Sequence, residues 1–386
     1  MKGENEISKF ISMVTLQPLS LSILLKVISY HFWHDYLIKC PEFVVATNSF
    51  ERLKEGAFLK NIGEDPYDGD IFHMQPLMLM FLKYVVWFPR AFLLLLLFFD
   101  TLSAFLLRSI SDKLTDGNEK VKNLVFILFL LNPMAIGTTA ALSTSTIFNF
   151  FVILSIYYYV NNESEKYTSL LALLTSLNIY YFTLLSTIFI KFPKKKFLLS
   201  TVFISMFILL HGINYTLSGN SFQYIQSTYM FQLKVPELYP DVGLFWYMFC
   251  EVFQHFETFF LTVFQIHIFI YMIPLAITLK RHPFLLLHVS LIIITCFTSY
   301  PSYGDAIIYL SLLPTQYSLF KKIKKSIVIF GALISCLVLF PTMWTIWMIY
   351  NAGNANFYFS LTLVYSLVHI FIASDMIYAQ TSITHE

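Results

Sequence analysis

The chain has 386 residues, of which 57% are hydrophobic and 12% are charged, and its formal net charge at pH 7 is +2. A soluble domain normally carries roughly 25% charged residues, so this chain has too few to cover itself with a solvated surface. The net charge is close to zero, so the sequence does not predict the basic surface on which nucleic-acid binding depends. Composition alone therefore predicts an integral membrane protein.

Apolar runs recur along almost the whole chain, and a hydrocarbon core about 30 Å thick requires about 20 such residues per helix. Backbone groups in lipid must be hydrogen-bonded within the protein, so spanning segments are helices or a closed barrel. Residues 91–107 and 326–349 are apolar on every face, without the alternation of a barrel strand. We therefore predict an all-α, polytopic membrane helical bundle that forms one domain over residues 1–386.

Basic residues cluster in four short loops, which should face the cytosol. These loops carry Lys113, Lys120 and Lys122; Lys191, Lys194, Lys195 and Lys196; Lys280 and Arg281; and Lys321, Lys322, Lys324 and Lys325. The resulting topology starts with a retained first helix over 14–35 and places both termini in the cytosol. The longest polar loop, residues 36–75, is then the first luminal loop, and we expect short helices in it.

The remaining elements follow in chain order from the same rule. A shallow helix is predicted over 76–89, and further spans near 91–110, 124–141, 145–160, 197–216, 259–279, 284–298, 305–320, 326–348 and 356–379. Residues 167–190 begin and end on the cytosolic side but are too few for two full spans. We predict a re-entrant pair of half-helices broken around 178–181. Ten full spans plus this pair give about twelve helical segments.

The first luminal loop and an aromatic stretch at 244–257 carry two of four polar groupings. In the loop, Asp68-Gly69-Asp70 fits either a divalent metal, through hard oxygen ligands, or ordinary acidic turns, and we predict no metal. The aromatic stretch is predicted to be an interfacial amphipathic helix, with Glu251, His255 and Thr258 on one face. Two explanations of this polar face remain open: it faces water, or it lines a groove for a lipid headgroup.

The other two groupings are turns between apolar runs. Asp305 begins a predicted helix, where it either caps the helix or contributes to a polar groove. Asn354 and Asn356 offer donors and acceptors to hydroxyl or phosphate groups, and turn formation is the competing explanation. Within the spans, Asp100 is expected to face a partner inside the bundle. The sequence shows no nucleophile with its base, so no catalytic residue is predicted.

The four polar groupings and one further segment, Leu131-Asn-Pro133, contain motifs that follow one another over about residues 40–380. They are Glu55-Gly56 through Asp65-Pro-Tyr-Asp-Gly69 with Phe72-His73-x-x-Pro76, then Leu131-Asn-Pro133, residues 242–260, Tyr300-Pro-x-x-Gly-Asp305 and Gly353-Asn-Ala-Asn-Phe357. This order resembles the PIG-U family, the U subunits of the GPI transamidase. The chain departs from the family in a shorter first cytosolic loop and in the extra acids Asp68 and Asp70.

The resemblance implies a non-catalytic subunit of an endoplasmic reticulum membrane complex that attaches GPI anchors to proteins. A cysteine-protease-like partner subunit would carry the chemistry, other luminal and membrane subunits would bind the chain, and no cofactor is implied. PIG-U proteins look like degenerate relatives of dolichol-phosphate-sugar glycosyltransferases, which implies a GT-C membrane fold. The residues implied in GPI-lipid binding are His73, Asn354, Asn356, Asp305, Tyr67, Trp246 and Glu251.

Two rival functions stay open on the sequence. An active polytopic mannosyltransferase of the endoplasmic reticulum would share the spans, but those enzymes resemble one another in an acidic pair before the Glu-Gly step. Residues 43–50, the corresponding stretch here, contain no acid. A transporter would show inverted repeats and charged residues deep in its spans. No internal repeat is visible, and Asp100 and Asp375 are the exceptions among few deep acids.

Overall fold

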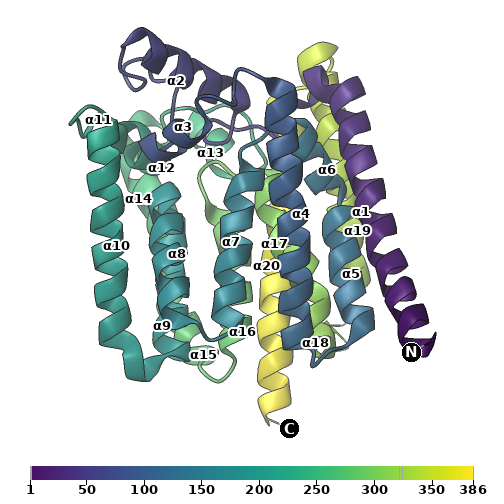
Figure 1. The fold of residues 1–386 in the computed structure, drawn as a ribbon. Helices are drawn as coiled ribbons and strands as arrows, with labels where there is room; N and C mark the ends of the chain where they lie inside the picture. The colour runs from purple at the N-terminus through teal and green to yellow at the C-terminus, as the bar shows by residue number, and fades with distance from the viewer. Residues whose placement is uncertain (1, 321, 324, 386) are drawn as a thin grey trace.

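The computed structural model describes residues 2–320, 322–323 and 325–385, and within them helices are the only regular secondary structure. Long helices lie side by side, as Figure 1 shows. Short helices cover one end of this bundle: α2 (Phe50–Ile62), α3 (Pro76–Leu82), α11 (Gln223–Ile225), α12 (Phe231–Lys234) and α13 (Phe245–Glu251). We call this the loop end. The first helix, α1 (Lys2–Leu37), begins at the opposite end.

Six helical segments of the described residues are long and apolar enough to cross a membrane. They comprise α4 (Pro89–Leu114); α5 (Glu119–Leu130) with α6 (Pro133–Ala140); α10 (Lys196–Leu217); α14 (Gln254–Ile270) with α15 (Met272–Thr278); α19 (Ser326–Trp344); and α20 (Ala355–His385). The shorter apolar helices include α7 (Ser145–Val160) and α16 (Pro283–Phe297). The described chain is thus that of an all-helical membrane protein. The helix lengths support six full spans and do not confirm the ten that were predicted.

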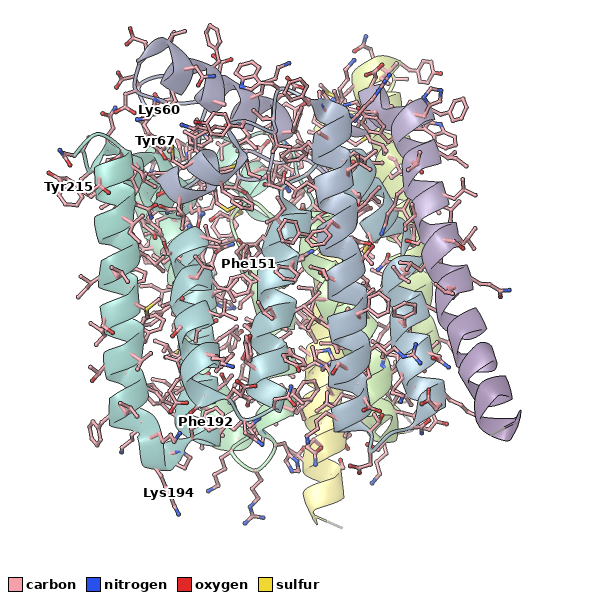
Figure 2. All side chains as sticks on the ribbon, in the orientation of Figure 1. Lys60, Tyr67, Phe151, Phe192, Lys194 and Tyr215 are labelled. Atoms are coloured by element: carbon pink, nitrogen blue, oxygen red, sulfur yellow. The ribbon has the colours of Figure 1, made fainter. Side chains whose placement is uncertain are left out.

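The first loop and two of the predicted basic loops lie at different ends of the bundle. Lys60 and Tyr67 of the first loop lie at the loop end, and Lys194 of a predicted basic loop lies at the other end (Figure 2). The turn between α4 and α5 lies at that same far end, which we call the basic end (Figure 1). The first loop thus lies opposite these two basic loops, whereas which end faces the cytosol stays a prediction.

The span predicted over 124–141 is divided into α5 and α6. Asn132 separates them with extended backbone (φ −64°, ψ 122°), and its side-chain oxygen accepts a hydrogen bond from the Met134 amide at 3.0 Å. Pro133 follows as the first residue of α6. Proline disfavours the helical region for the residue before it and lacks an amide hydrogen, so the helix is interrupted here. The predicted span itself is confirmed, because α5 and α6 together are long and apolar enough to cross a membrane.

Residues 164–191 fold back on themselves as α8 (Ser164–Leu177) and α9 (Leu185–Lys191). Asn178 interrupts the helix with extended backbone, and its side-chain oxygen accepts a hydrogen bond from the Tyr180 amide at 3.1 Å. The hydroxyls of Tyr167 and Thr187 lie 2.7 Å apart. A continuous helix would separate these residues by about 30 Å. The break predicted around 178–181 is therefore confirmed.

The single amphipathic helix predicted over 244–257 is wrong. Helix α13 ends at Glu251, Val252 is extended (ψ 132°), and α14 follows. The rings of Phe249 and Phe264 lie 5.6 Å apart, whereas one straight helix would separate them by about 22 Å. The chain bends here because α13 turns its aromatic side chains into the bundle while α14 leaves most of its surface unburied.

Three further boundaries differ from the prediction. Helix α3 ends at Leu82 and not near residue 89, and α4 begins at Pro89, a favourable first position for proline. The predicted span over 305–320 is divided into α17 (Tyr303–Leu312) and α18 (Tyr317–Phe320), because Pro314 lies in the 3-10 turn between them. These proline positions were visible in the sequence.

The acid predicted to face a partner inside the bundle does so. Asp100 on α4 forms an ion pair with Lys26 on α1, and both residues are buried. Nearby, the Ser22 hydroxyl donates to the Leu130 carbonyl at 2.7 Å. These polar contacts between α1, α4 and α5 fix how the first helix is seated against the bundle.

Candidate functional site

The first loop enters the loop end of the bundle between α1 and α2. Asn48 holds it there, because its side-chain amide donates to the Ser145 hydroxyl at 2.9 Å, at the start of α7. Phe43 packs against Gly137 of α6 so closely that a Cβ at position 137 would lie 2.3 Å from its ring. Only glycine fits this contact. The loop is thereby clamped against α6 and α7.

This loop lines two small adjoining cavities of about 80 Å³ and 30 Å³ that have six lining residues in common, and we call them together the inner chamber. Its polar lining includes Asn48, His73, Ser145, Asn178, Gln232 and Asp305. A space of this size holds a few water molecules or one small polar group. The structure thus brings together His73 and Asp305, two of the residues selected from the sequence.

His73 presents an unpaired acceptor to the inner chamber. Its Nδ1 donates to the Ser227 carbonyl at 2.9 Å, and its ring stacks on Phe231 with centroids 3.5 Å apart. Because a carbonyl only accepts, the ring proton sits on Nδ1 and Nε2 keeps its lone pair. This buried Nε2 has no hydrogen-bond partner among the described residues. Burial lowers the pKa of His73, so the imidazole is neutral at pH 7.

Gln232 and Asp305 add further acceptors. The Gln232 carbonyl anchors α12 by accepting from Ser299 Oγ at 2.6 Å and Gln265 Nε2 at 2.9 Å, while its side-chain oxygen is buried without a partner in the described chain. The Asp305 carboxylate accepts from the Ser302 amide at 2.7 Å in a capping box, so Asp305 does cap the helix, which is one of the two explanations left open on the sequence. The acceptors of His73, Gln232 and Asp305 suit a group that donates hydrogen bonds.

A wider cavity of about 320 Å³, the outer cavity, adjoins the inner chamber and shares Val45 and Tyr300 with its lining. Its charged residues are Lys39, Arg52, Glu237 and Asp241. The guanidinium of Arg52 is ion-paired with Glu237. Charges of both signs therefore line the wide part of this site, and hydrogen-bond acceptors line the narrow part.

Asp241 is the buried acid of the outer cavity. One carboxylate oxygen accepts from the Gly243 amide at 2.7 Å, and the other has no partner in the part of the chain that the structure describes. Burial raises the pKa of this carboxyl well above its usual range. The raised pKa favours the protonated form, in which the free oxygen can donate to a ligand.

Trp246, Asn354 and Asn356 gather at a second place, where α13 meets the start of α20. Trp246 is buried against Phe359, with ring centroids 5.9 Å apart. The Tyr247 hydroxyl donates to the Asn356 side chain. The Asn354 side chain accepts from the Asn356 amide at 3.1 Å, so it forms a turn at the head of α20. Both asparagines are exposed, and neither lines the inner chamber or the outer cavity.

Tyr67 and Glu251 lie outside both groupings. Tyr67 is buried, and its hydroxyl donates to the Met74 carbonyl at 2.9 Å, so it supports the loop that carries His73. Glu251 is exposed at the end of α13. Asp68 accepts from Gln223 at 2.7 Å, and no grouping of three potential metal ligands occurs in the described residues. The acidic turn is the explanation that these contacts support.

Glu42 is the residue that sequence reasoning passed over. It is fully buried, the Tyr358 hydroxyl donates to one carboxylate oxygen at 3.0 Å, and the other oxygen has no partner among the described atoms. Burial raises the pKa of this carboxyl to about 7, although hydrogen bonds oppose the shift. Its sequence position, beside Cys40-Pro41 at the end of a long helix, gave no sign of burial.

The chain is similar to known proteins over most of its length. The family model described as GPI transamidase subunit PIG-U matches residues 19–365. The human protein named GPI-anchor transamidase component PIGU is 29% identical over 387 residues, covering 89% of this chain and 88% of its own length. GPI transamidase component GAB1 of Saccharomyces cerevisiae is 26% identical over 351 residues, with 89% and 88% covered. The chain therefore belongs to the PIG-U family of GPI transamidase subunits.

Proposed function

We propose that this chain is a non-catalytic subunit of the GPI transamidase in the endoplasmic reticulum membrane, where it holds the GPI lipid and scaffolds the other subunits. The observation that carries the proposal is the match of the family model over residues 19–365, together with relatives in human and yeast that are named as transamidase components. In the membrane, the chain would form one domain of about twelve helical segments with a GT-C-like arrangement and cytosolic termini.

The environment of the cysteines supports a non-catalytic role. A cysteine nucleophile needs a lowered pKa, supplied by a nearby base or cation. Cys40 and Cys250 lie outside both the long and the shorter apolar helices, and both pKa values are shifted upward. Burial raises the pKa of Cys40 to about 12, and burial together with Glu251 raises that of Cys250. The chemistry then belongs to a cysteine-protease-like partner subunit.

The loop end supplies the proposed contacts with the polar part of the GPI lipid. Hydroxyl and ammonium groups of a glycolipid donate hydrogen bonds, and the inner chamber offers His73, Gln232 and Asp305 as acceptors. The exposed Asn354 and Asn356 would contact a different part of the same lipid. The buried Trp246 and Tyr67 would then support these two sites, and the exposed Glu251 would lie at their edge. Such contacts would position the lipid for attack, a proximity effect.

The outward faces of the long helices supply the proposed contacts with membrane partners. Helices α10, α14 and α19 are largely unburied by the rest of the chain, and they expose Ile208, Phe259 and Val328 among other apolar side chains. Large exposed apolar faces in a membrane protein contact lipid or neighbouring helices. Either use fits a subunit of a larger complex.

Affinity purification from gently solubilised membranes tests the proposal directly. The tagged chain should recover a cysteine-protease-like subunit and further luminal and membrane subunits in stoichiometric amounts, identified by mass spectrometry. A chain recovered alone that transfers mannose from a dolichol donor would overturn the proposal. In that case Asp68 and Asp70 would become the first residues to mutate.

A further inference from the structure

A groove of about 700 Å³ lies on the side of the bundle and shares no lining residue with the inner chamber. Its three walls are α5, the α17–α18 segment and α19, and its lining is almost wholly apolar, with Leu124 and Leu128 on one wall and Leu333 and Leu337 on another. Leu124 and Leu128 are also partly exposed, so the groove opens outward. Its volume falls in the range of about 300–1,000 Å³ that is typical of small-molecule sites.

Two walls of this groove belong to helices that are long and apolar enough to cross a membrane. The groove therefore meets the hydrocarbon region, and an acyl chain fits its surface. Lipid tails are as apolar as leucine, so this contact selects no particular lipid by itself. Selection has to come from the charged groups at the end of the groove.

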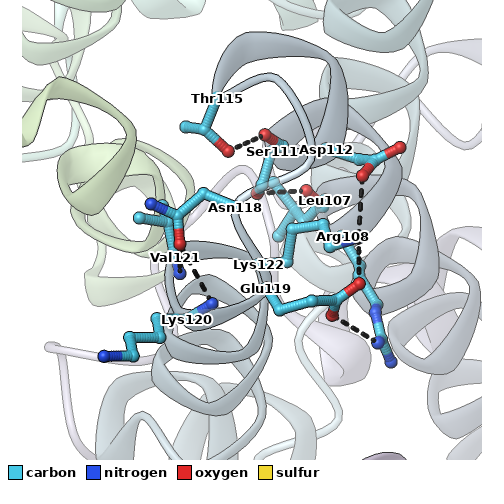
Figure 3. Close-up of polar contacts among 10 residues, drawn as sticks. All are labelled: Leu107, Arg108, Ser111, Asp112, Thr115, Asn118, Glu119, Lys120, Val121 and Lys122. Carbon is cyan, nitrogen blue, oxygen red and sulfur yellow. Dashed lines mark hydrogen bonds and ion pairs between the residues drawn. The ribbon is translucent and has the colours of Figure 1, made fainter. Parts of the chain in front are cut away.

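Four charged residues at the α4–α5 turn neutralise one another. The Lys122 ammonium lies 2.7 Å from the Asp112 carboxylate and 2.6 Å from that of Glu119, and Arg108 lies 3.6 Å from Glu119 (Figure 3). We call these four residues the α4–α5 network. Two acids and two bases balance within it, so it contributes little net field to the groove.

Lys120 differs from its neighbours in direction and surroundings. Its side chain extends away from the α4–α5 network in Figure 3, is exposed, and lines the groove. The wall formed by α19 begins directly after Lys325, which is exposed. Lys120 and Lys325 therefore place positive charge at this end of the groove.

We propose that this groove binds an anionic phospholipid, with an acyl chain between α5 and α19 and the phosphate beside Lys120. Basic pockets between membrane helices bind anionic headgroups, and each lysine near such a surface adds to the attraction. This site goes beyond the proposed function, since it lies at the basic end and involves none of the residues assigned to GPI. The chain would then bind anionic phospholipids in preference to neutral ones.

Lipid retention on the purified protein tests the headgroup contact. The full-length chain, with the subunits that co-purify, is exposed to equal amounts of phosphatidylserine and phosphatidylcholine, and native mass spectrometry measures the ratio bound. We expect a preference for phosphatidylserine that Lys120→Gln reduces by about fivefold, the weight of one lysine at an anionic surface. Lys113→Gln, at an exposed lysine of the same end outside the groove lining, should leave the ratio unchanged.

Equal binding of the two lipids, or an equal response to Lys120→Gln and Lys113→Gln, would overturn the proposal. A photoreactive diazirine amino acid at Leu128 identifies the occupant of the groove independently of affinity. A phospholipid adduct supports the lipid site. An adduct with a peptide of another subunit overturns it, because the groove would then be a contact between membrane helices.

Discussion

The interior of the bundle and its basic end carry the same kinds of charged side chain in opposite arrangements. Inside, Lys26 and Asp100 form a buried pair, and the buried Glu42 side chain accepts a hydrogen bond from Tyr358. At the basic end, the four residues of the α4–α5 network share their contacts, and its acids are more than half exposed. Water can replace a partner in the network but not in the interior, so interior substitutions should have far larger effects.

The largest effect is expected at the buried pair. Lys26→Leu leaves Asp100 as an unpaired buried charge, which should cost about 3–5 kcal/mol of folding free energy. Replacing both residues with leucine removes the pair without leaving a charge and should restore most of that stability. Thermal unfolding of the purified chain in detergent measures both. A double variant that is less stable than Lys26→Leu would show that the pair itself is net stabilising.

The next effect is expected at Glu42 and depends on pH. Its folded-state pKa, about 7, lies above the ordinary value of 4.5, so the folded protein binds the proton more tightly than the unfolded chain. This stability is fully present below pH 4.5 and is lost as pH rises through about 7, a change of about 3 kcal/mol. Glu42→Gln, which still accepts from Tyr358, should flatten the unfolding profile between these values. An unchanged slope would exclude Glu42 as its source.

A smaller and purely functional effect is expected in the inner chamber. Gln232→Met removes a buried acceptor that has no partner among the described residues, so thermal stability should stay within about 1 kcal/mol. Attachment of a GPI-anchored reporter, in cells that depend on this chain, should fall by about tenfold if a ligand uses that acceptor. Gln226→Met makes the same change at an exposed position nearby and is the control. Equal activity of the two variants would remove Gln232 from the site.

The smallest effect is expected in the α4–α5 network. Asp112→Asn should change the unfolding free energy by less than about 1 kcal/mol, because Lys122 keeps its contact with Glu119. Raising the salt concentration should remove even this difference, since exposed pairs are screened. A loss as large as that of Lys26→Leu would contradict the distinction between the two regions.

The sequence predicted that the chain is a helical membrane protein, and it predicted some of the breaks within the helices but not all of them. The Asn178 break followed from counting residues between two basic loops, and Asn132-Pro133 was readable but was passed over. The bend at Val252 was not predictable, because no proline or glycine marks it and burial of the α13 aromatics decides it. Tertiary packing therefore overrode a locally plausible helix.

Some residues of the candidate site were also predicted from the sequence, and others were not. The motifs that contain His73 and Asp305 are distinctive in sequence, and both residues line the inner chamber. Gln232 and Glu42 carry no motif, and only the fold shows that they are buried with an oxygen left unpaired. The asparagines of the α20 turn matched a motif equally well, yet they lie on the surface. Sequence pattern identified unusual residues but could not tell which of them face the same space.

The Lys26–Asp100 pair also bears on how the chain is made. An unpaired lysine within a membrane helix costs about 2.5–3.5 kcal/mol, and the partner of Lys26 is synthesised 74 residues later. Until α4 has been made, the Lys26 ammonium on α1 therefore has no Asp100 carboxylate to offset its charge. A chain that stops short of α4 carries this charge without its partner.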